Sequence, residues 1–324
     1  MANSDILELS NDGKTVIGVY DNSVKSITIF DGVTQIGKDA FWGCSSLQSI
    51  NIPNSVTKIG HDAFRGCSSL QSIDIPNSVT KIGLEAFWSC SSLQRIDIPN
   101  SVTEIGENVF HFCSSLQNIN VSKGNMYFAS VDGVLFNKDL TVILRFPPKY
   151  DVKEYVIPNS VTEIGKCAFF DCSSLQSIDI PNSVTKIGLE AFESCSSLQS
   201  IDIPNSVTEI GGAAFWGCSS LQSIDIPNSV TKIGHSAFRN CSSLQSIVIP
   251  NSVTKIANSA FLDCSSLEHI YLHYNNVEKL TLGESIFEGV NFDKCILHVP
   301  SGTRWAYRHH DVFKRFKNIV TIGF

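Results

Sequence analysis

Residues Ser49–Gln71 read SINIPNSVTKIGHDAFRGCSSLQ, and residues Ser72–Gln94 read SIDIPNSVTKIGLEAFWSCSSLQ. The same unit recurs every 23 residues along most of the chain. Four units run over residues 26–117 and five over residues 154–268. A fixed period of this length is typical of solenoid proteins, in which short coils stack on one another.

The first part of the unit predicts a short strand. In Leu70–Ile75 (LQSIDI) apolar and polar residues alternate, so the two isoleucines are expected to point inward and Asp74 to point away. Pro76 should end the strand because it has no N–H to donate, and the Asn-Ser pair that follows should turn the chain.

The rest of the unit predicts a second inward-facing segment. Val79 and Ile82 face the interior, Gly83 is expected to ease the next bend, and Phe87 and Cys90 fill the remaining space. About eight apolar residues per unit point inward, which is more than one coil can bury alone. Stacking buries them, and each Ile, Leu, Val or Phe then contributes roughly 1.5–3 kcal/mol. We therefore expect a β-rich repeat solenoid of 23-residue coils with short helical turns.

Most of the eleven cysteines belong to the repeat. A free cysteine packs as a small hydrophobic residue, so the repetition predicts buried thiols. Disulfides between neighbouring coils and a metal site remain alternatives, although the spacing matches no zinc motif. The repeat cysteines are Cys44, Cys67, Cys90, Cys113, Cys172, Cys195, Cys218, Cys241 and Cys264.

The repeats lie between expected caps in one continuous domain. Caps are needed because an open terminal coil exposes apolar residues and strand edges. A helix is expected after Ser301, with Trp305, His309 and Phe313 on its apolar side. The expected segments are a capping hairpin (1–25), four repeats (26–117), an oversized coil with a β-hairpin (118–153), five repeats (154–268), and a degenerate repeat with the C-terminal cap (269–324).

The unit CxxLxxIxIPxxVTxIGxxAF, as in Cys67–Phe87, resembles the BspA-like leucine-rich repeat. The insert at Ser130–Asp139 (SVDGVLFNKD) and the tail from Cys295 also look like those of that family, and the departures are small, Val109 for Ala and Ala257 for Gly. The resemblance implies a leucine-rich-repeat right-handed superhelix. It also implies a bacterial surface or secreted protein that adheres to host or neighbouring-cell proteins or glycans, including host extracellular matrix. Because the first residues show no export signal, an intracellular (cytoplasmic) scaffold or effector and a structural coat component remain alternatives.

Two rows of outward residues are candidate binding surfaces. The first row follows the LxxIxI strand, where like charges on neighbouring strands repel and would attract a cationic partner. The second row follows the buried Phe, and its Trp and Arg are enriched in interface hot spots. A solvated face and a cover for the seams between coils are the respective alternatives. The first row is Asn51, Asp74, Asp97, Asn120, Asp179, Asp202 and Asp225, and the second is Trp42, Arg65, Trp88, His111, Phe170, Glu193, Trp216, Arg239 and Leu262.

Several function classes are disfavoured. A net charge of −7 argues against nucleic-acid binding, and no apolar run is long enough to span a membrane. Neither a phosphate-binding loop nor a nucleophile elbow is present, so we expect no enzyme, no cofactor and no metal. The potential ligands in the last quarter fit no standard spacing and are interpreted as scattered cap residues. They are His269, His273, Cys295, His298, His309 and His310.

Overall fold

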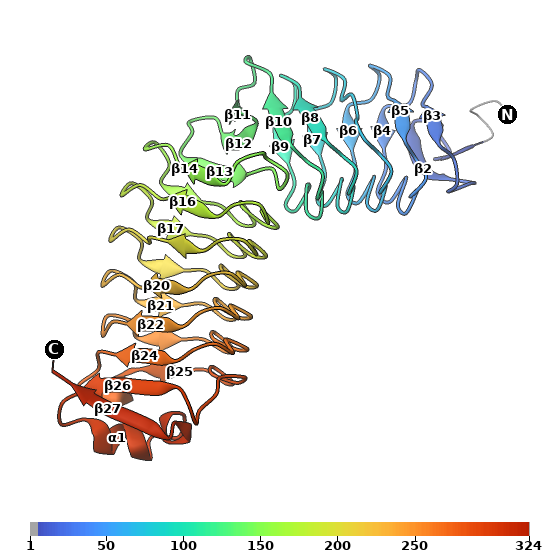
Figure 1. Ribbon diagram of the computed structural model, residues 1–324. Helices are drawn as coiled ribbons and strands as arrows, with labels where there is room; N and C mark the ends of the chain where they lie inside the picture. Colours follow the sequence, from blue (N-terminus) through green and yellow to red (C-terminus); the bar gives the residue numbers. More distant parts are fainter. Residues whose placement is uncertain (1–5, 324) are drawn as a thin grey trace. The chain divides into compact units, whose positions relative to one another are not determined.

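The computed structural model describes residues 6–323 and divides into two compact units, with the boundary between Tyr150 and Asp151. In each unit, coils of the repeat follow one another as a stack (Figure 1). The solenoid expected from the period is confirmed, and helices are few. Residues 1–5 of the expected N-terminal cap and residue 324 of the C-terminal cap lie outside the described residues.

The first unit contains two series of strands and one antiparallel insert. The N-terminal hairpin of β1 and β2 and the short second segments of the coils build one sheet in the order β1-β2-β4-β6-β7-β9. The LxxIxI segments pair as β3 with β5 and β8 with β10. The strands are β1 (Leu7–Leu9), β2 (Thr15–Val19), β3 (Ser26–Thr28), β4 (Gln35–Ile36), β5 (Ser49–Asn51), β6 (Lys58–Ile59), β7 (Lys81–Ile82), β8 (Arg95–Ile98), β9 (Glu104–Ile105), β10 (Asn118–Val121), β11 (Phe128–Val131), β12 (Val134–Asn137) and β13 (Val142–Arg145).

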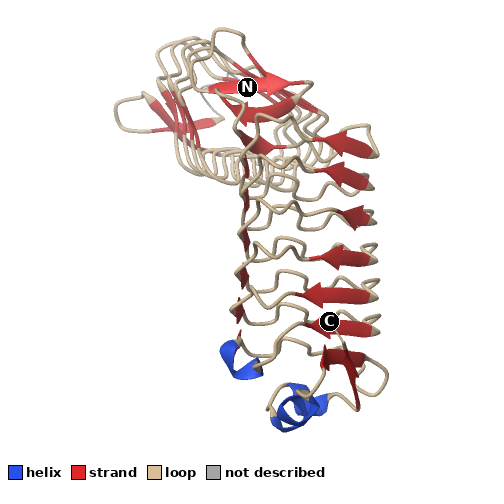
Figure 2. Ribbon diagram, turned by 90° about the vertical axis from the view of Figure 1, so that its left-hand side faces the viewer, coloured by secondary structure: helices blue, strands red, loops and turns tan. Residues whose placement is uncertain are grey.

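The second unit repeats this arrangement, and its strands form two separate columns (Figure 2). One runs β15-β17-β19-β21-β23-β25, and the other consists of β14-β16-β18 and then β20-β22-β24-β26-β27. The elements are β14 (Glu154–Val156), β15 (Glu163–Ile164), β16 (Ser177–Asp179), β17 (Lys186–Ile187), β18 (Ser200–Ile201), β19 (Glu209–Ile210), β20 (Ser223–Asp225), β21 (Lys232–Ile233), β22 (Ser246–Ile249), β23 (Lys255–Ile256), β24 (His269–Leu272), η2 (Val277–Lys279), β25 (Thr281–Leu282), β26 (Ile296–Pro300), α1 (Arg304–His309), η3 (Phe313–Arg315) and β27 (Asn318–Ile322).

Equivalent phenylalanines form a ladder through each core. The rings of Phe41 and Phe64 are stacked with centroids 5.2 Å apart, and those of Phe64 and Phe87 are 5.3 Å apart. In the second unit the ladder runs from Phe169 to Phe287, and all of these rings are buried. Offset stacking adds about 0.5–1.5 kcal/mol per pair to the burial of the rings. The stack therefore favours the same residue at every repeat.

The cysteines form a second ladder of buried thiols. The Sγ of Cys67 donates to the carbonyl of Phe41 at 3.2 Å, and the Sγ of Cys90 donates to that of Phe64 at 3.1 Å. All eleven cysteines are free and buried, as expected for thiols that pack in the core. Burial raises the pKa of Cys113 to about 12. Since the thiolate is the reactive form, this thiol is not a nucleophile at neutral pH.

The glycine after the second segment has a different role from the one expected. Gly83 does not adopt a positive φ, and a Cβ at this residue would lie 2.5 Å from the carbonyl carbon of Gly60 in the preceding coil. Glycine is therefore needed for close approach of two backbones. The left-handed residue of the bend comes two positions later, as at Asp62 (φ 53°) and Glu85 (φ 54°).

The insert is a three-stranded antiparallel sheet. Strand β12 pairs with β13, as the expected hairpin required, and also with β11 across a tight turn at Asp132 and Gly133. The side chain of Asn125, which is fully buried, ties the insert to the last regular coil of the unit. Its amide nitrogen donates to the carbonyls of Pro99 and Val102, both at 2.9 Å.

The C-terminal cap differs from its expected form. Helix α1 is only six residues long, its N-cap is Thr303 instead of Ser301, and its buried residue is Tyr307. Trp305, which was expected on the apolar side, is 73% exposed and stacks on His309 with centroids 4.3 Å apart. Because the helix ends at His309, the apolar stripe cannot continue along it, and Phe313 is instead buried from η3.

Candidate functional site

The first candidate row lies on the solvent side of the LxxIxI strands, and we call it the acidic row. Asp179, Asp202 and Asp225 follow one another on the second unit, and all three side chains are exposed. Successive parallel strands lie about 4.8 Å apart, so these carboxylates are neighbours. In the first unit, exposed Asp97 accepts a 2.8 Å hydrogen bond from the amide of Asn120, while Asp74 and Asn51 are also exposed. The acidic row is thus a continuous polar surface in each unit.

The acidic row changes character at the end of the second unit. In strand register, Asp225 is followed by Val248, Tyr271, His298 and Val320 on β22, β24, β26 and β27. We call these last four residues, with His269, the histidine face. Val320 is 38% exposed, and the other four side chains are partly buried. A charged surface therefore becomes aromatic and apolar within one sheet.

Aromatic contacts order the histidine face. The ring of Tyr271 stacks on that of His298, with centroids 4.2 Å apart and an interplanar angle of 10°. The Nδ1 of His269 lies 3.0 Å from the Nε2 of His298. Burial, and then the neighbouring His269, lower the pKa of His298. These two histidines are therefore not scattered, as the sequence spacing suggested, because adjacent strands bring them together.

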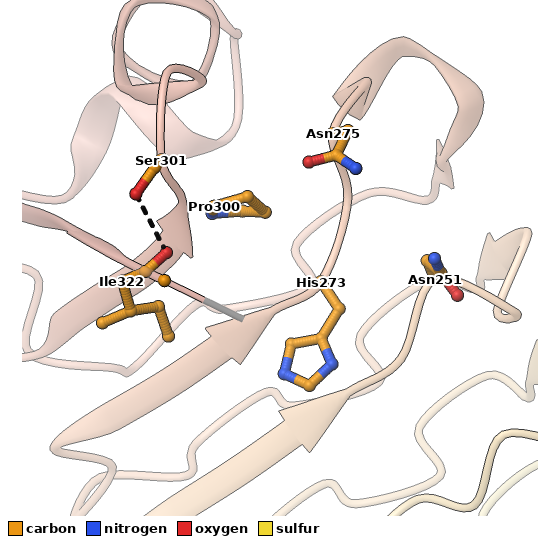
Figure 3. A pocket seen from close by; sticks show the side chains of 7 residues that line it. Asn251, His273, Asn275, Pro300, Ser301 and Ile322 are labelled. Carbon is orange, nitrogen blue, oxygen red and sulfur yellow. Dashed lines mark hydrogen bonds between the residues drawn. The ribbon is translucent and has the colours of Figure 1, made fainter.

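A cavity of about 400 Å³ opens at the carboxyl end of these strands. Asn251, His273 and Asn275 lie on one side of it, and Ser301 and Ile322 lie on the other (Figure 3). The Ser301 hydroxyl donates to the carbonyl of Ile322 at 3.3 Å. Burial lowers the pKa of His273. The lining offers amide, hydroxyl and imidazole groups to a polar ligand.

The second candidate row forms a ridge beside the phenylalanine ladder, and in the first unit we call it the first ridge. It comprises Trp42, Arg65, Trp88 and His111. Trp42 is 62% exposed, whereas His111 is buried. The guanidinium of Arg65 lies 4.9 Å from the ring of Trp88 and forms ion pairs with Asp62, at 3.0 Å, and with Glu85.

Trp88 continues the first ridge toward the insert. Its ring stacks on His111 at 4.4 Å and contacts the edge of Phe112 at 5.2 Å. Phe112 is 44% exposed. It is not a member of the candidate row predicted from the sequence, because it follows His111 by one position. Most of the first ridge therefore covers the seams between coils, and Trp42 and Phe112 are the large apolar side chains that remain exposed on it.

The second ridge belongs to the second unit and comprises Phe170, Glu193, Trp216, Arg239 and Leu262. Arg239 lies 5.0 Å from the ring of Trp216, which repeats the Arg–Trp contact of the first ridge. Phe170 is buried, and the other four residues are partly buried. Burial, and then nearby Glu190, raise the pKa of Glu193 to about 7. The second ridge is accordingly less exposed than the residue types suggested.

Comparison with known families identifies the repeat. The BspA-type leucine-rich repeat region matches residues 19–133, 146–268 and 185–314. The chain belongs to the BspA-type leucine-rich repeat family. Leucine-rich repeat solenoids are typically non-enzymatic binding scaffolds, and BspA-type relatives are bacterial surface proteins. Comparison with curated proteins finds no match.

Solved structures of bacterial relatives share this fold. The pneumococcal vaccine antigen PcpA is 27% identical, with a TM-score of 0.73 over 98% of this chain and 82% of that chain. A leucine-rich cell surface protein from Faecalibacterium prausnitzii is 28% identical, with a TM-score of 0.60 over 84% of this chain and 94% of that chain. A leucine-rich repeat protein from Eubacterium ventriosum is 23% identical, with a TM-score of 0.73 over 85% of this chain and 88% of that chain, and this likeness shows the fold alone.

The described part of this BspA-type chain offers neither a bilayer-spanning helix nor a metal cluster. Over residues 6–323, no helix has the length and hydropathy to span a bilayer. Within the same range, no group of three or more His, Cys, Asp or Glu side chains is placed to hold a metal ion. The sequence did not predict the histidine face, because the 23-residue spacing is lost toward its end. The available signal was the replacement of the repeat Asp by Val248 and Tyr271.

Proposed function

We propose that the chain is a non-catalytic binding module of the adhesin type, exposed on a bacterial cell surface or secreted. Its ligand is a protein or glycan of a host or of a neighbouring cell, including host extracellular matrix. The family supports this proposal, since relatives include a cell surface protein and a vaccine antigen.

Trp42 carries the proposal. A tryptophan that is 62% exposed leaves a large apolar surface in water, and Trp42 has no aromatic or cation–π partner among residues 6–323. Tryptophan and arginine dominate binding hot spots because they bury much area and lose little conformational freedom. The first ridge, with Trp42, Arg65 and Trp88, is therefore our first choice of contact surface, and Trp216 and Arg239 of the second ridge extend the same chemistry.

The acidic row adds an electrostatic component. Asp179, Asp202 and Asp225 repel one another across neighbouring strands, and a cationic patch on a partner relieves that repulsion. The net charge of −7 has the same sign, so the whole chain favours approach of a basic partner. We expect this contribution to weaken with added salt.

The test measures binding of the purified chain to immobilised matrix proteins and cell-surface extracts by biolayer interferometry. Trp42→Ser should weaken binding by about thirtyfold, because a hot-spot truncation costs about 2 kcal/mol. Trp305→Ser is the matched control, since Trp305 is 73% exposed but lies in the C-terminal cap. Equal affinities of the two variants would remove the first ridge from the binding surface. Replacing all three aspartates of the second unit by Lys then tests the acidic row.

An intracellular interaction scaffold is a second candidate. All eleven cysteines are free, and proteins of reducing compartments keep their thiols. Surface biotinylation of intact cells that express the native gene separates the two candidates. Labelling of the protein on intact cells supports the adhesin, and labelling only after lysis supports the scaffold.

A further inference from the structure

Two imidazole nitrogens meet on the histidine face of the second unit. Parallel strands β24 and β26 place Tyr271 opposite His298 and His269 opposite Ile296, so the two histidines are diagonal neighbours on one face. Their nearest ring nitrogens, Nδ1 of His269 and Nε2 of His298, are 3.0 Å apart. Two nitrogens at this distance either share one proton or bind one metal ion.

The separation matches the bite of a tetragonal metal ion. Imidazole nitrogens bind first-row divalent ions at about 2.0–2.1 Å, so two cis ligands at a right angle lie about 2.9 Å apart. A tetrahedral angle would place them about 3.3 Å apart. Copper(II) favours the tetragonal arrangement and binds nitrogen ligands most tightly among these ions. We propose that His269 and His298 form a two-imidazole site for Cu²⁺.

The neighbouring residues orient the two ligands. The ring of Tyr271 covers one face of His298 at 4.2 Å, and both histidines extend from adjacent strands of the same sheet. The other nitrogen of His298, Nδ1, is buried and has no hydrogen-bond partner among residues 6–323. The contact of Nε2 with His269 is therefore the interaction of the His298 ring nitrogens that a metal ion has to replace. Such fixed rings lose little rotational freedom when the ion binds.

The remaining coordination positions are open. No third His, Cys, Asp or Glu of residues 6–323 completes the set, so water or a donor from a bound partner occupies these positions. Pro300, in the lining of the cavity, is two residues beyond His298 on β26. At about 3.3 Å per residue, the Cα atom of Pro300 lies about 7 Å along the strand from that of His298.

The experiment titrates the full chain with CuSO₄ in a buffer that does not coordinate Cu²⁺, and binding is measured by calorimetry and electron paramagnetic resonance. We expect one Cu²⁺ per chain with an axial spectrum split by two nitrogens. His269→Gln and His298→Gln should each weaken this binding by more than about tenfold, since even loss of an outer contact weakens metal sites by 10–100-fold. His235→Gln, which removes an exposed histidine of the same unit, should leave it unchanged.

A second measurement on the unaltered chain covers the case in which a variant fails to fold by circular dichroism. Cu²⁺ should protect His269 and His298, but not His235, from modification by diethyl pyrocarbonate, mapped by mass spectrometry. Equal copper affinity in folded His269→Gln and in the unaltered chain would overturn the proposal. Equal modification of the pair with and without Cu²⁺ would overturn it as well.

Discussion

Replacing Asn125 by Asp should destabilise the first unit strongly although the two side chains have nearly the same shape. Asn125 is fully buried and uses both ends of its amide. Its Oδ1 accepts from the backbone N–H of Tyr127 at 2.8 Å and of Phe128 at 2.9 Å. Its Nδ2 donates to the carbonyls of Pro99 and Val102, so Asn125→Asp keeps the first pair of bonds and loses the second.

The loss of stability is set by the carbonyls of Pro99 and Val102, which lose the donor of Asn125. The carbonyl of Val102 loses its side-chain donor, and that of Pro99 keeps only a 3.3 Å bond from the N–H of Val102. An unsatisfied buried acceptor costs about 1–3 kcal/mol, so the expected loss at pH 8 is about 2–4 kcal/mol. The introduced carboxylate also faces two carbonyl oxygens, which raises its pKa above the unfolded value of about 3.9. The variant should therefore regain stability as the pH falls from 8 to 5, because the protonated carboxyl group donates one bond.

Urea unfolding of the full chain at pH 8 and pH 5, followed by circular dichroism, measures this loss. Hydrogen exchange of the peptide containing Tyr127 and Phe128 assigns it to the first unit. Asn54→Asp, which makes the same chemical change at an exposed residue, should shift stability by no more than about 0.5 kcal/mol. If Asn125→Asp costs no more than this control at pH 8, the hydrogen bonds of Asn125 do not tie the insert to the coil.

Two further predictions concern buried titratable groups. In non-reducing denaturant all eleven cysteines should react with Ellman's reagent. In the native chain they should react slowly, because all of them are buried. Fewer than eleven reactive thiols in denaturant would indicate disulfides. Burial raises the pKa of Glu193 to about 7 in the folded chain. The stability that the protonated Glu193 side chain contributes is therefore present below the unfolded pKa and is lost as the pH rises through 7. Glu193→Gln should therefore raise the urea midpoint at pH 8 and change it little at pH 5. The gain at pH 8 should be worth at most about 1 kcal/mol, because the side chain is only partly buried. Equal gains at both pH values would contradict this assignment.

The fold could be predicted because each core residue packs against its own copy. A sequence that repeats Phe and Cys every 23 residues states which side chains are neighbours, and the ladders from Phe41 and Cys44 follow directly. Asn125 could not be predicted, since it lies where the period is broken and its bonds reach residues 23 and 26 positions away. The prediction that Gly83 eases a bend was wrong for a related reason. Close approach of Gly83 to Gly60 is a property of two coils and not of one.

The candidate surfaces also arise from contacts between equivalent positions of adjacent coils. A side chain outside the core also lies about 5 Å from the equivalent position of the next coil. Substitutions in two adjacent coils therefore create a contact without altering the ladders, as Arg65 with Trp88 and Tyr271 with His298 do. His269 and His298 are 29 residues apart, and β24 and β26 still pair in parallel after the regular repeats have ended. A binding site can thus arise where the repeat degenerates, because relaxed spacing brings new pairs together while strand pairing holds them in place.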